Sequence, residues 1–269
     1  MQRWLGCRTL GAAVGVVVAG TAAGLMARQP AEGDLGGVVA SQAGPEAGVW
    51  VIAETDDLDT KFRKIVVTDD AGRFLLPDLP AASYRVWVRG YGLVDSQPLV
   101  AEPGETVELT AVVAATPQDA AAVYPANYWY SLLEPPAADE FPGTGPQGNG
   151  ISPGLRSQAA WVDVTKQGCQ LCHQMGNRFT FETAHLSQFD STRAAWAHRL
   201  TFGQRGRQMA GVLNRFGADR GLDMFADWSD RIAAGEVPAA PPRPRGVERN
   251  LVLTMWDWGG DTSYVHDEI

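Results

Sequence analysis

Hydrophobic and polar residues alternate along several stretches between residues 33 and 115. In "SYRVWVRGYG", Tyr84, Val86 and Val88 share one face of an extended chain, and the other face carries Arg85, Trp87 and Arg89. "GVWVIAET" alternates in the same way, and "RKIVVTDDAGRFLLPDL" holds a turn at residues 70–72 between two apolar runs. A period of two, interrupted by Asp, Gly and Pro, is typical of antiparallel strands. The pattern predicts an all-β sandwich over residues 33–115.

The pattern changes to a helical period between residues 157 and 236. "QAAWVDVTKQGC" predicts a first helix, and "STRAAWAHRLT" predicts a second with Ser191 as its N-cap. "RQMAGVLNRF" and "GLDMFADWSDRIAAGE" predict two more helices, ended by Gly217 and Gly235. We expect an all-α domain here, so the chain is predicted to be multidomain.

The segments around these two domains have a different character. Residues 116–156 are rich in Pro, Gly and aromatics and predict a linker, with a short helix over 124–133 and aromatics that pack onto a neighbour. Near the end, residues 246–269 contain one apolar strand starting at Leu251. A lone strand cannot form a core, so we expect this segment to begin a further domain of a longer chain.

Residues 1–27 have the layout of a secretory signal peptide: Arg3 and Arg8, an apolar run, then small residues between Ala22 and Ala27. The alternative is an uncleaved anchor, which would be the chain's one contact with a membrane. Either way, the protein is predicted to be exported, to the periplasm or beyond. The formal net charge of −9 argues against nucleic acid as a partner, since phosphate binding needs clustered Lys and Arg.

After cleavage two cysteines remain, and both lie in the motif Cys169-Gln170-Leu171-Cys172-His173. With 3 Cys and 4 His in the chain, such a motif is expected by chance only about five times in ten thousand. A zinc site could use Cys169 and Cys172 with His185 and His198, but it leaves His173 without a role. A redox pair normally sits in a βαβ setting, which is not predicted here.

Covalent c-type haem attachment explains every residue of the motif. Two cysteines form thioethers with the porphyrin vinyl groups, and the following histidine ligates the iron. Attachment takes place outside the bacterial cytoplasm, in agreement with the signal segment. We therefore expect one covalent haem c held by Cys169, Cys172 and His173.

Residues 157–236 resemble a monohaem cytochrome c domain, with the motif on the first helix and "FADWSDRIAAGEVP" as the closing helix that packs across it. The resemblance implies that an aromatic, Trp228, meets the first helix. It also implies a distal iron ligand, and Met209, 16 residues before Phe225, fits best. Other residues remain open as distal ligands: Met224, His185 and His198, whereas Met175 is too close to His173 to reach over the ring.

Further residues around the haem are predicted from their type. Arginine forks match carboxylates, so three arginines are candidates to pair with haem propionates; a solvated turn is the alternative. Three aromatics are expected to form the haem wall or, alternatively, to fill the core. The arginines are Arg199, Arg205 and Arg207, and the aromatics are Phe179, Phe181 and Trp196.

Residues 33–115 resemble the carboxypeptidase regulatory-like, transthyretin-like sandwich family, through "GGVVASQAGPEAGVWVIAE", "VVTDDAGRFLLPDLPAASYRVWVRGYG" and "PGETVELTAV". The family usually has Gly where this chain has Ser83. The resemblance implies a seven-stranded, carbohydrate-binding-like fold that serves as a spacer or as a glycan-binding module. Trp50, Trp87 and Tyr91 are the candidates for a sugar-stacking surface.

The last residues resemble, weakly, the entry to a β-propeller of large exported proteins, with polar residues there as candidates for a metal or active site: Asp257, Asp261, His266, Asp267 and Glu268. The sequence thus predicts an electron-transfer protein with a periplasmic redox partner, and no catalytic residue of its own. Two alternatives stay open: a glycan- or envelope-binding protein with an accessory haem, and a haem enzyme or gas sensor with an open distal position.

Overall fold

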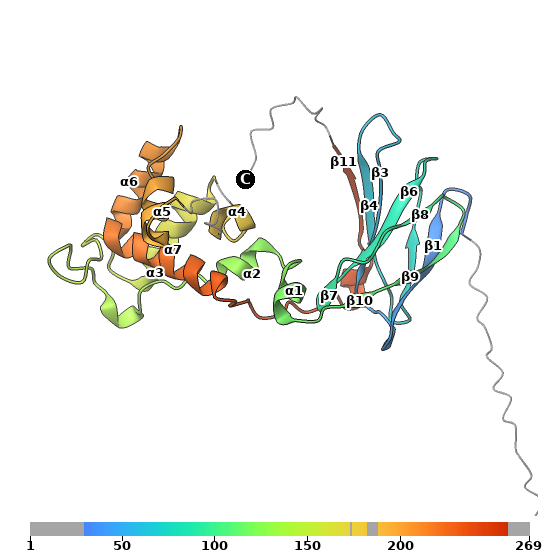
Figure 1. Ribbon diagram of the computed structural model, residues 1–269, viewed down its shortest axis with the longest axis horizontal. Coiled ribbons are helices and arrows are strands. Elements are labelled where there is room, and N and C mark those ends of the chain that lie inside the picture. Colours follow the sequence, from blue (N-terminus) through green and yellow to red (C-terminus); the bar gives the residue numbers. More distant parts are fainter. Residues whose placement is uncertain (1–29, 173, 182–187, 258–269) are drawn as a thin grey trace, which may run out of the picture.

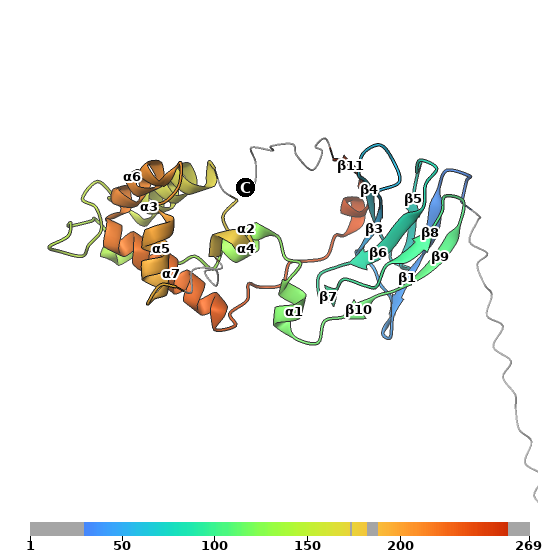
Figure 2. The same ribbon diagram turned by 45° about the horizontal axis from the view of Figure 1, so that its top comes forward.

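The structure is a computed structural model, and it describes residues 30–172, 174–181 and 188–257. The predicted signal segment, residues 1–27, lies outside the described residues. Strands gather at one end of the molecule and most helices at the other, with short helices and extended chain between them (Figure 1). Turning the molecule keeps the same two groups apart (Figure 2). Among the described residues, no helix combines the length and apolar character needed to cross a membrane.

The strands form two main sheets that pack as a β-sandwich, which confirms the prediction for this half. In the first sheet β1 lies between β5 and β9, and it also pairs with β2; its pairing with β9 is parallel. The second sheet has the order β11-β4-β3-β6-β8, all antiparallel, and β10 pairs with β7. The strands are β1 (Leu35–Ser41), β2 (Gly44–Pro45), β3 (Trp50–Thr55), β4 (Phe62–Val67), β5 (Arg73–Leu76), β6 (Tyr84–Arg89), β7 (Leu93–Val94), β8 (Leu99–Ala101), β9 (Thr106–Thr110), β10 (Val112–Val113) and β11 (Val252–Trp256).

Alternation along β6 builds the sandwich core as predicted. Tyr84, Val86 and Val88 are fully buried, whereas the residues between them face outward. The hydroxyl of Tyr84 donates a hydrogen bond to the carbonyl of Pro80 at 2.9 Å, and burial raises the pKa of Tyr84 to about 12. A buried hydroxyl without an acceptor would cost about 1–3 kcal/mol, so this hydrogen bond lets an aromatic side chain fill the core.

The strand near the C-terminal end lies elsewhere than predicted. β11 was expected to open a further domain, but it pairs antiparallel with the edge strand β4, with Thr254 opposite Lys64. The backbone N–H of Asp257 donates to the carbonyl of Lys61 and extends this pairing. A single strand such as β11 cannot pair its own backbone N–H and C=O groups, and the free edge of β4 supplies the hydrogen-bond partners. Asp261, His266, Asp267 and Glu268 lie outside the described residues.

The helical half contains α3 (Gln158–Thr165), the π-helical turn η2 (Lys166–Gln170), α4 (Arg178–Phe181), α5 (Thr192–Arg199), α6 (Gly206–Phe216) and α7 (Ala218–Ala233). The predicted cap of α5 is confirmed, because the Ser191 hydroxyl accepts the N–H of Ala194. α6 ends at Gly217 as predicted. α7 begins earlier than expected and contains Gly221, where an added Cβ would lie 2.8 Å from a Leu213 methyl. The absence of a side chain at Gly221 lets α6 and α7 pack closely.

The predicted linker packs against the helical half, as its aromatics indicated. It forms α1 (Pro117–Ala121), α2 (Ala126–Tyr130) and the 3₁₀ turn η1 (Ala138–Glu140). Ile151 and Leu155 are buried in the helical core, and the side chain of Trp129 packs against it. These residues extend the helical half beyond the boundary at residue 157 that the sequence suggested.

Two stretches of chain connect the halves. In the first, α1 contacts β7 of the sandwich, and the amide of Gln118 donates to the carbonyl of Gly235. In the second, after α7, Arg243 binds the carboxylate of Glu46 at 2.5 Å and the carbonyl of Tyr91 at 2.9 Å. We call residues 237–251 the return segment, because they lead the chain back to the sandwich.

Candidate functional site

The first half of the Cys-x-x-Cys-His motif lies where α3 widens into the π-helical turn η2. Ser157 caps α3 through the N–H of Ala160, and Trp161 is fully buried on its inner side. In η2, an added Cβ at Gly168 would lie only 2.4 Å from a methyl of Val212, so η2 and α6 are in close contact. Single π turns inside helices recur at functional sites. Here the turn places Cys169 directly beside α6.

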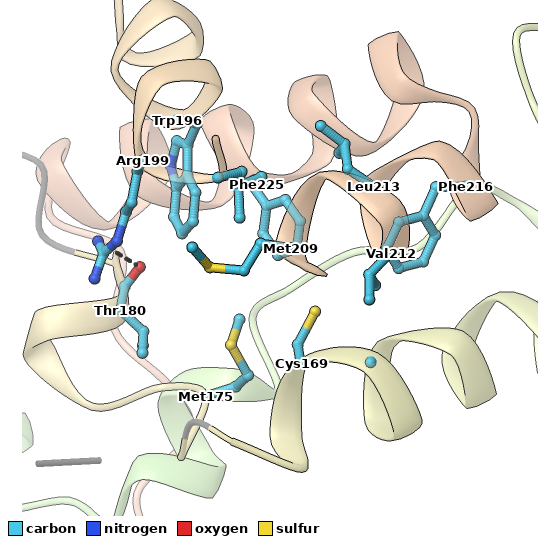
Figure 3. A pocket seen from close by; sticks show the side chains of 12 residues that line it. Cys169, Met175, Thr180, Trp196, Arg199, Met209, Val212, Leu213, Phe216 and Phe225 are labelled. Atoms are coloured by element: carbon cyan, nitrogen blue, oxygen red, sulfur yellow. Dashed lines mark hydrogen bonds between the residues drawn. The ribbon is translucent and has the colours of Figure 1, made fainter. Parts of the chain in front are cut away.

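Cys169 lines an apolar cavity of about 140 Å³ between η2, α5, α6 and α7. Figure 3 shows the sulfur of Cys169 on one wall and the Met209 side chain reaching in from α6, with Met175 below them. The remaining lining is mostly apolar. The full set is Gly168, Cys169, Met175, Thr180, Trp196, Arg199, Leu200, Met209, Val212, Leu213, Phe216 and Phe225.

The two cysteines have different surroundings. Burial, with a smaller contribution from the charge of Cys172, raises the pKa of Cys169 to about 11. Cys172 is exposed, and both thiols are free. At neutral pH Cys169 is therefore a neutral thiol, which disfavours a nucleophilic or redox role because those need the thiolate. His173, the predicted proximal ligand, lies outside the described residues.

Among the predicted distal ligands, the structure brings Met209 to the cavity. Met209 is the fourth residue of α6, on the face that also carries Val212 and Leu213. Met224 is instead buried in the core, where its sulfur accepts the indole N–H of Trp161 at 3.2 Å. This contact gives Met224 a role in core packing, away from the cavity lining.

His198 and His185 were the two histidines considered as distal iron ligands. The His198 ring packs against Phe189 and Phe202, with ring centroids 4.9 Å apart in each pair, and His198 is not part of the cavity lining. His185 lies outside the described residues. Within the described residues, no group of three or more His, Cys, Asp or Glu side chains could hold a metal ion.

Met175 lies at the cavity, although its closeness to His173 along the chain excluded it as an iron ligand. It is only 6% exposed and lines the cavity beside Cys169. The next residue, Gly176, has a φ of +95°, and an added Cβ would lie 1.9 Å from the carbonyl oxygen of Ala126. Only glycine allows the chain to turn so closely against α2. In the sequence, the glycine directly after Met175 was the signal that could have predicted a tight turn and a buried Met175.

The three predicted wall aromatics have three different positions. Trp196 lines the cavity, stacks on Phe225 at 4.8 Å, and donates its indole N–H to Ser229. Phe181 is buried but packs on Trp129, away from the cavity lining. The prediction for Phe179 is wrong: its side chain is 82% exposed. α4 is a single short turn, and its inner face is taken by Thr180 and Phe181.

The closing helix also meets its neighbours differently from the prediction. Trp228 is fully buried, but its indole N–H donates to the carbonyl of Trp129 in α2, and its ring packs edge-on against Phe181 in α4. The contact between α7 and α3 is made one turn earlier, by Met224 with Trp161. Trp228 was expected to contact the first helix, but the segment that contains α2 makes this contact instead.

The aromatics considered for sugar stacking pack mainly on other side chains. Trp50 and Tyr91 are in edge-to-face contact at 4.8 Å, and Tyr91 in turn contacts Tyr124 at 5.6 Å. Trp87 lies under the guanidinium of Arg89, 4.9 Å from the ring centroid. The contact between Tyr91 and Tyr124 joins the sandwich to the segment before α2.

Comparisons with known proteins add little. No family model matches the chain, and no curated protein matches it. A chain in the crystal structure of a type II cohesin–X-dockerin complex from Acetivibrio cellulolyticus is similar over 30% of this chain and 57% of that chain, at 15% identity and a TM-score of 0.23. Similarity at this level carries no argument about function, so the site has to be interpreted from its own chemistry.

Proposed function

We propose that the helical half carries one covalent c-type haem and that the protein transfers single electrons outside the cytoplasm. One observation carries this proposal: Cys169 of the Cys-x-x-Cys-His motif and Met209 of α6 line the same apolar cavity. The motif supplies two attachment sulfurs and a proximal ligand, and the cavity supplies a thioether for the distal side. The segment over residues 1–27 supports export, which haem attachment requires.

The chemistry of the wall suits this role. Each cysteine would add its S–H across one porphyrin vinyl group, forming a C–S bond and passing the proton to the neighbouring carbon, with no net oxidation. The product at Cys169 is a neutral thioether, which an apolar wall tolerates better than a thiolate. His173 and Met209 would ligate the iron from the two sides. Haem iron cycles between its ferrous and ferric states and so carries one electron.

The volume of the cavity adds a requirement. A cavity of about 140 Å³ resembles the ~150 Å³ engineered cavity that holds benzene, and a porphyrin is much larger. Met175 lies on the wall next to Cys169, so its side chain must move for the ring to enter (Figure 3). We therefore propose that haem attachment and the final packing of the helical half are coupled, as metal binding and folding are in small metalloproteins.

The test is expression of the full chain with a cytochrome c maturation system. We expect haem that stays on the polypeptide after acid-acetone extraction and a protein mass increased by one haem. C169A and C172A should each form at most one thioether, and the double variant should release all haem on extraction. Absence of covalent haem from the unaltered protein would contradict the proposal, and zinc analysis of the same sample would then test the tetrahedral alternative.

The remainder of the molecule has an accessory role in this proposal. The β-sandwich presents the haem half to a periplasmic redox partner, or holds it near the surface to which the sandwich binds. Glycan binding by the sandwich is a secondary proposal. It would be tested by glycan-array binding of the full chain, compared with the W87A variant.

A further inference from the structure

Three sulfur atoms face the small cavity in the helical half. Cys169 lies in η2, Met175 in the turn before α4, and Met209 in α6. Figure 3 shows the thiol of Cys169 and the two thioethers around the same space. Each sulfur comes from a different element, so the packing of the helical half brings the three together.

The backbone holds two of these sulfurs in place. At Gly168, next to Cys169, an added Cβ would lie 2.4 Å from a methyl group of α6. At Gly176, next to Met175, the φ is +95°, and an added Cβ would lie 1.9 Å from the carbonyl oxygen of Ala126 in α2. Each sulfur is therefore carried by backbone that packs tightly against a helix, which favours a pre-organised site.

The other polar side chains of the lining are not free to bind a metal ion. The Thr180 hydroxyl accepts the N–H of Gly176 at 2.9 Å and donates to the carbonyl of Asn177 at 2.7 Å. Arg199 is a cation with N–H donors and no acceptor atom. Among the side chains that line the cavity, the electron pairs open to a metal ion are those of sulfur.

The ligand set and the nearby positive charge select the kind of ion. Thiolate and thioether sulfurs are soft ligands, which favour Cu(I). Coordination removes the proton of the Cys169 thiol, which passes to water, so Cu(I) and one thiolate form a neutral unit. A divalent ion on the same ligands would leave an unpaired positive charge in an apolar cavity that also borders Arg199, and burying such a charge is costly.

We propose that Cys169, Met175 and Met209 form a three-sulfur site for one Cu(I) ion in the protein without haem. The cavity of about 140 Å³ has room for the ion, since a water molecule needs only about 10–15 Å³ of such space. Within the described residues, no group of three or more His, Cys, Asp or Glu side chains offers a competing site. Haem attachment would convert Cys169 into a thioether, so the proposal concerns a separate state of the chain.

The test is Cu(I) binding by the full chain, purified without haem and with C7S, in anaerobic competition with a coloured Cu(I) chelator. We expect one ion per chain, and C169S should abolish binding. M175L and M209L should each weaken binding at least ~10-fold, because even outer residues of metal sites change affinity by about 10–100-fold. Leucine is close to methionine in volume, so these variants remove sulfur with little change in packing.

Two controls distinguish this site from other sulfur sites. C172A removes the other cysteine of the motif, which is exposed, and should bind Cu(I) as tightly as the unaltered chain. M224L removes a thioether that is buried away from the cavity lining, and it should also leave the affinity unchanged. X-ray absorption at the copper edge should show three sulfur neighbours.

The outcomes either support the site or overturn it. If C172A abolishes binding while M175L and M209L match M224L, the two cysteines bind the ion and the three-sulfur site is overturned. Binding by the unaltered chain no tighter than by C169S also overturns it. If C169S fails to fold, M175L and M209L decide, and unchanged affinity in both overturns the site. Haem attachment is measured on separate samples after maturation, so a failure of one proposal leaves the other standing.

Discussion

The raised pKa of Cys169 gives a prediction about the protein without the proposed haem. Thiolate, not thiol, reacts with iodoacetamide. At about pH 8 a thiol with the ordinary pKa of 9.0 is roughly one tenth ionised, whereas one with pKa ~11 is about 0.1% ionised. With the pKa of Cys169 raised to about 11, alkylation of folded apoprotein should be ~100-fold slower than that of an unstructured cysteine peptide.

The assay needs single-thiol proteins. C7S/C172A leaves Cys169 as the one reactive thiol, and C7S/C169A leaves the exposed Cys172 as the control for reagent access. Mass spectrometry follows alkylation against pH, and denaturant should abolish the slow rate at Cys169. If folded C7S/C172A reacts as fast as the peptide, Cys169 does not face an apolar wall, and the argument for the cavity fails.

The same shift has a consequence for stability. The folded state holds Cys169 protonated more strongly than the unfolded chain does, so the contribution is complete below the unfolded pKa of 9.0 and is lost as pH rises toward about 11. Two pKa units correspond to ~3 kcal/mol. Apoprotein should therefore lose up to this much unfolding free energy across that range, and C169A should lose less. Equal pH profiles for the two proteins would contradict the assignment.

Three further predictions concern ligation, packing and the connection between the halves. M209A should abolish the weak far-red absorption band of methionine-ligated ferric haem, whereas M175A should keep it; the reverse result would make Met175 the ligand. F216A removes a fully buried ring and should lower the unfolding free energy by about 3–5 kcal/mol, measured by denaturant titration of apoprotein; a loss under about 1 kcal/mol would show that α6 is not part of the core. R243A leaves the buried carboxylate of Glu46 without its partner and should cost about 1–2 kcal/mol, with faster proteolysis in the return segment; an unchanged cleavage rate would show that this ion pair does not hold the segment.

Local patterns were enough to predict much of the fold. The alternation in β6 and the cap of α5 are properties of neighbouring residues, and the structure has both as expected. β11 was misplaced because its partner β4 lies almost 200 residues earlier in the chain, and no local pattern encodes which sheet edge a strand will join. The early start of α7 was missed because Gly221 looks like a helix breaker, whereas it provides close contact with α6.

The chemistry of the candidate site stays a prediction, and its geometry could be predicted only in part. The spacing of Cys169 and Cys172 follows from the motif alone. Met175 was excluded by its distance from His173 along the chain, yet the turn at Gly176 directs it into the cavity. Phe179 was expected inside because it is aromatic, but neighbouring Thr180 and Phe181 take the inner positions of a one-turn helix. Whether these side chains point inward depends on how they pack against α2, and the residue type alone does not reveal that packing.

The return of the chain to β4 makes the helical half an insertion between strands of one sandwich. A single backbone cut within the helical half would therefore leave two fragments, each with strands in the same sheet. The N-terminal fragment keeps β4, the C-terminal fragment keeps β11, and their pairing runs from Val252 opposite Val66 to Trp256 opposite Phe62. A nicked molecule should migrate as one species under native conditions and separate only when denatured. If the proposed haem is attached to the N-terminal fragment, it would then stay associated with the fragment that supplies Met209, provided that the cut falls between His173 and Met209.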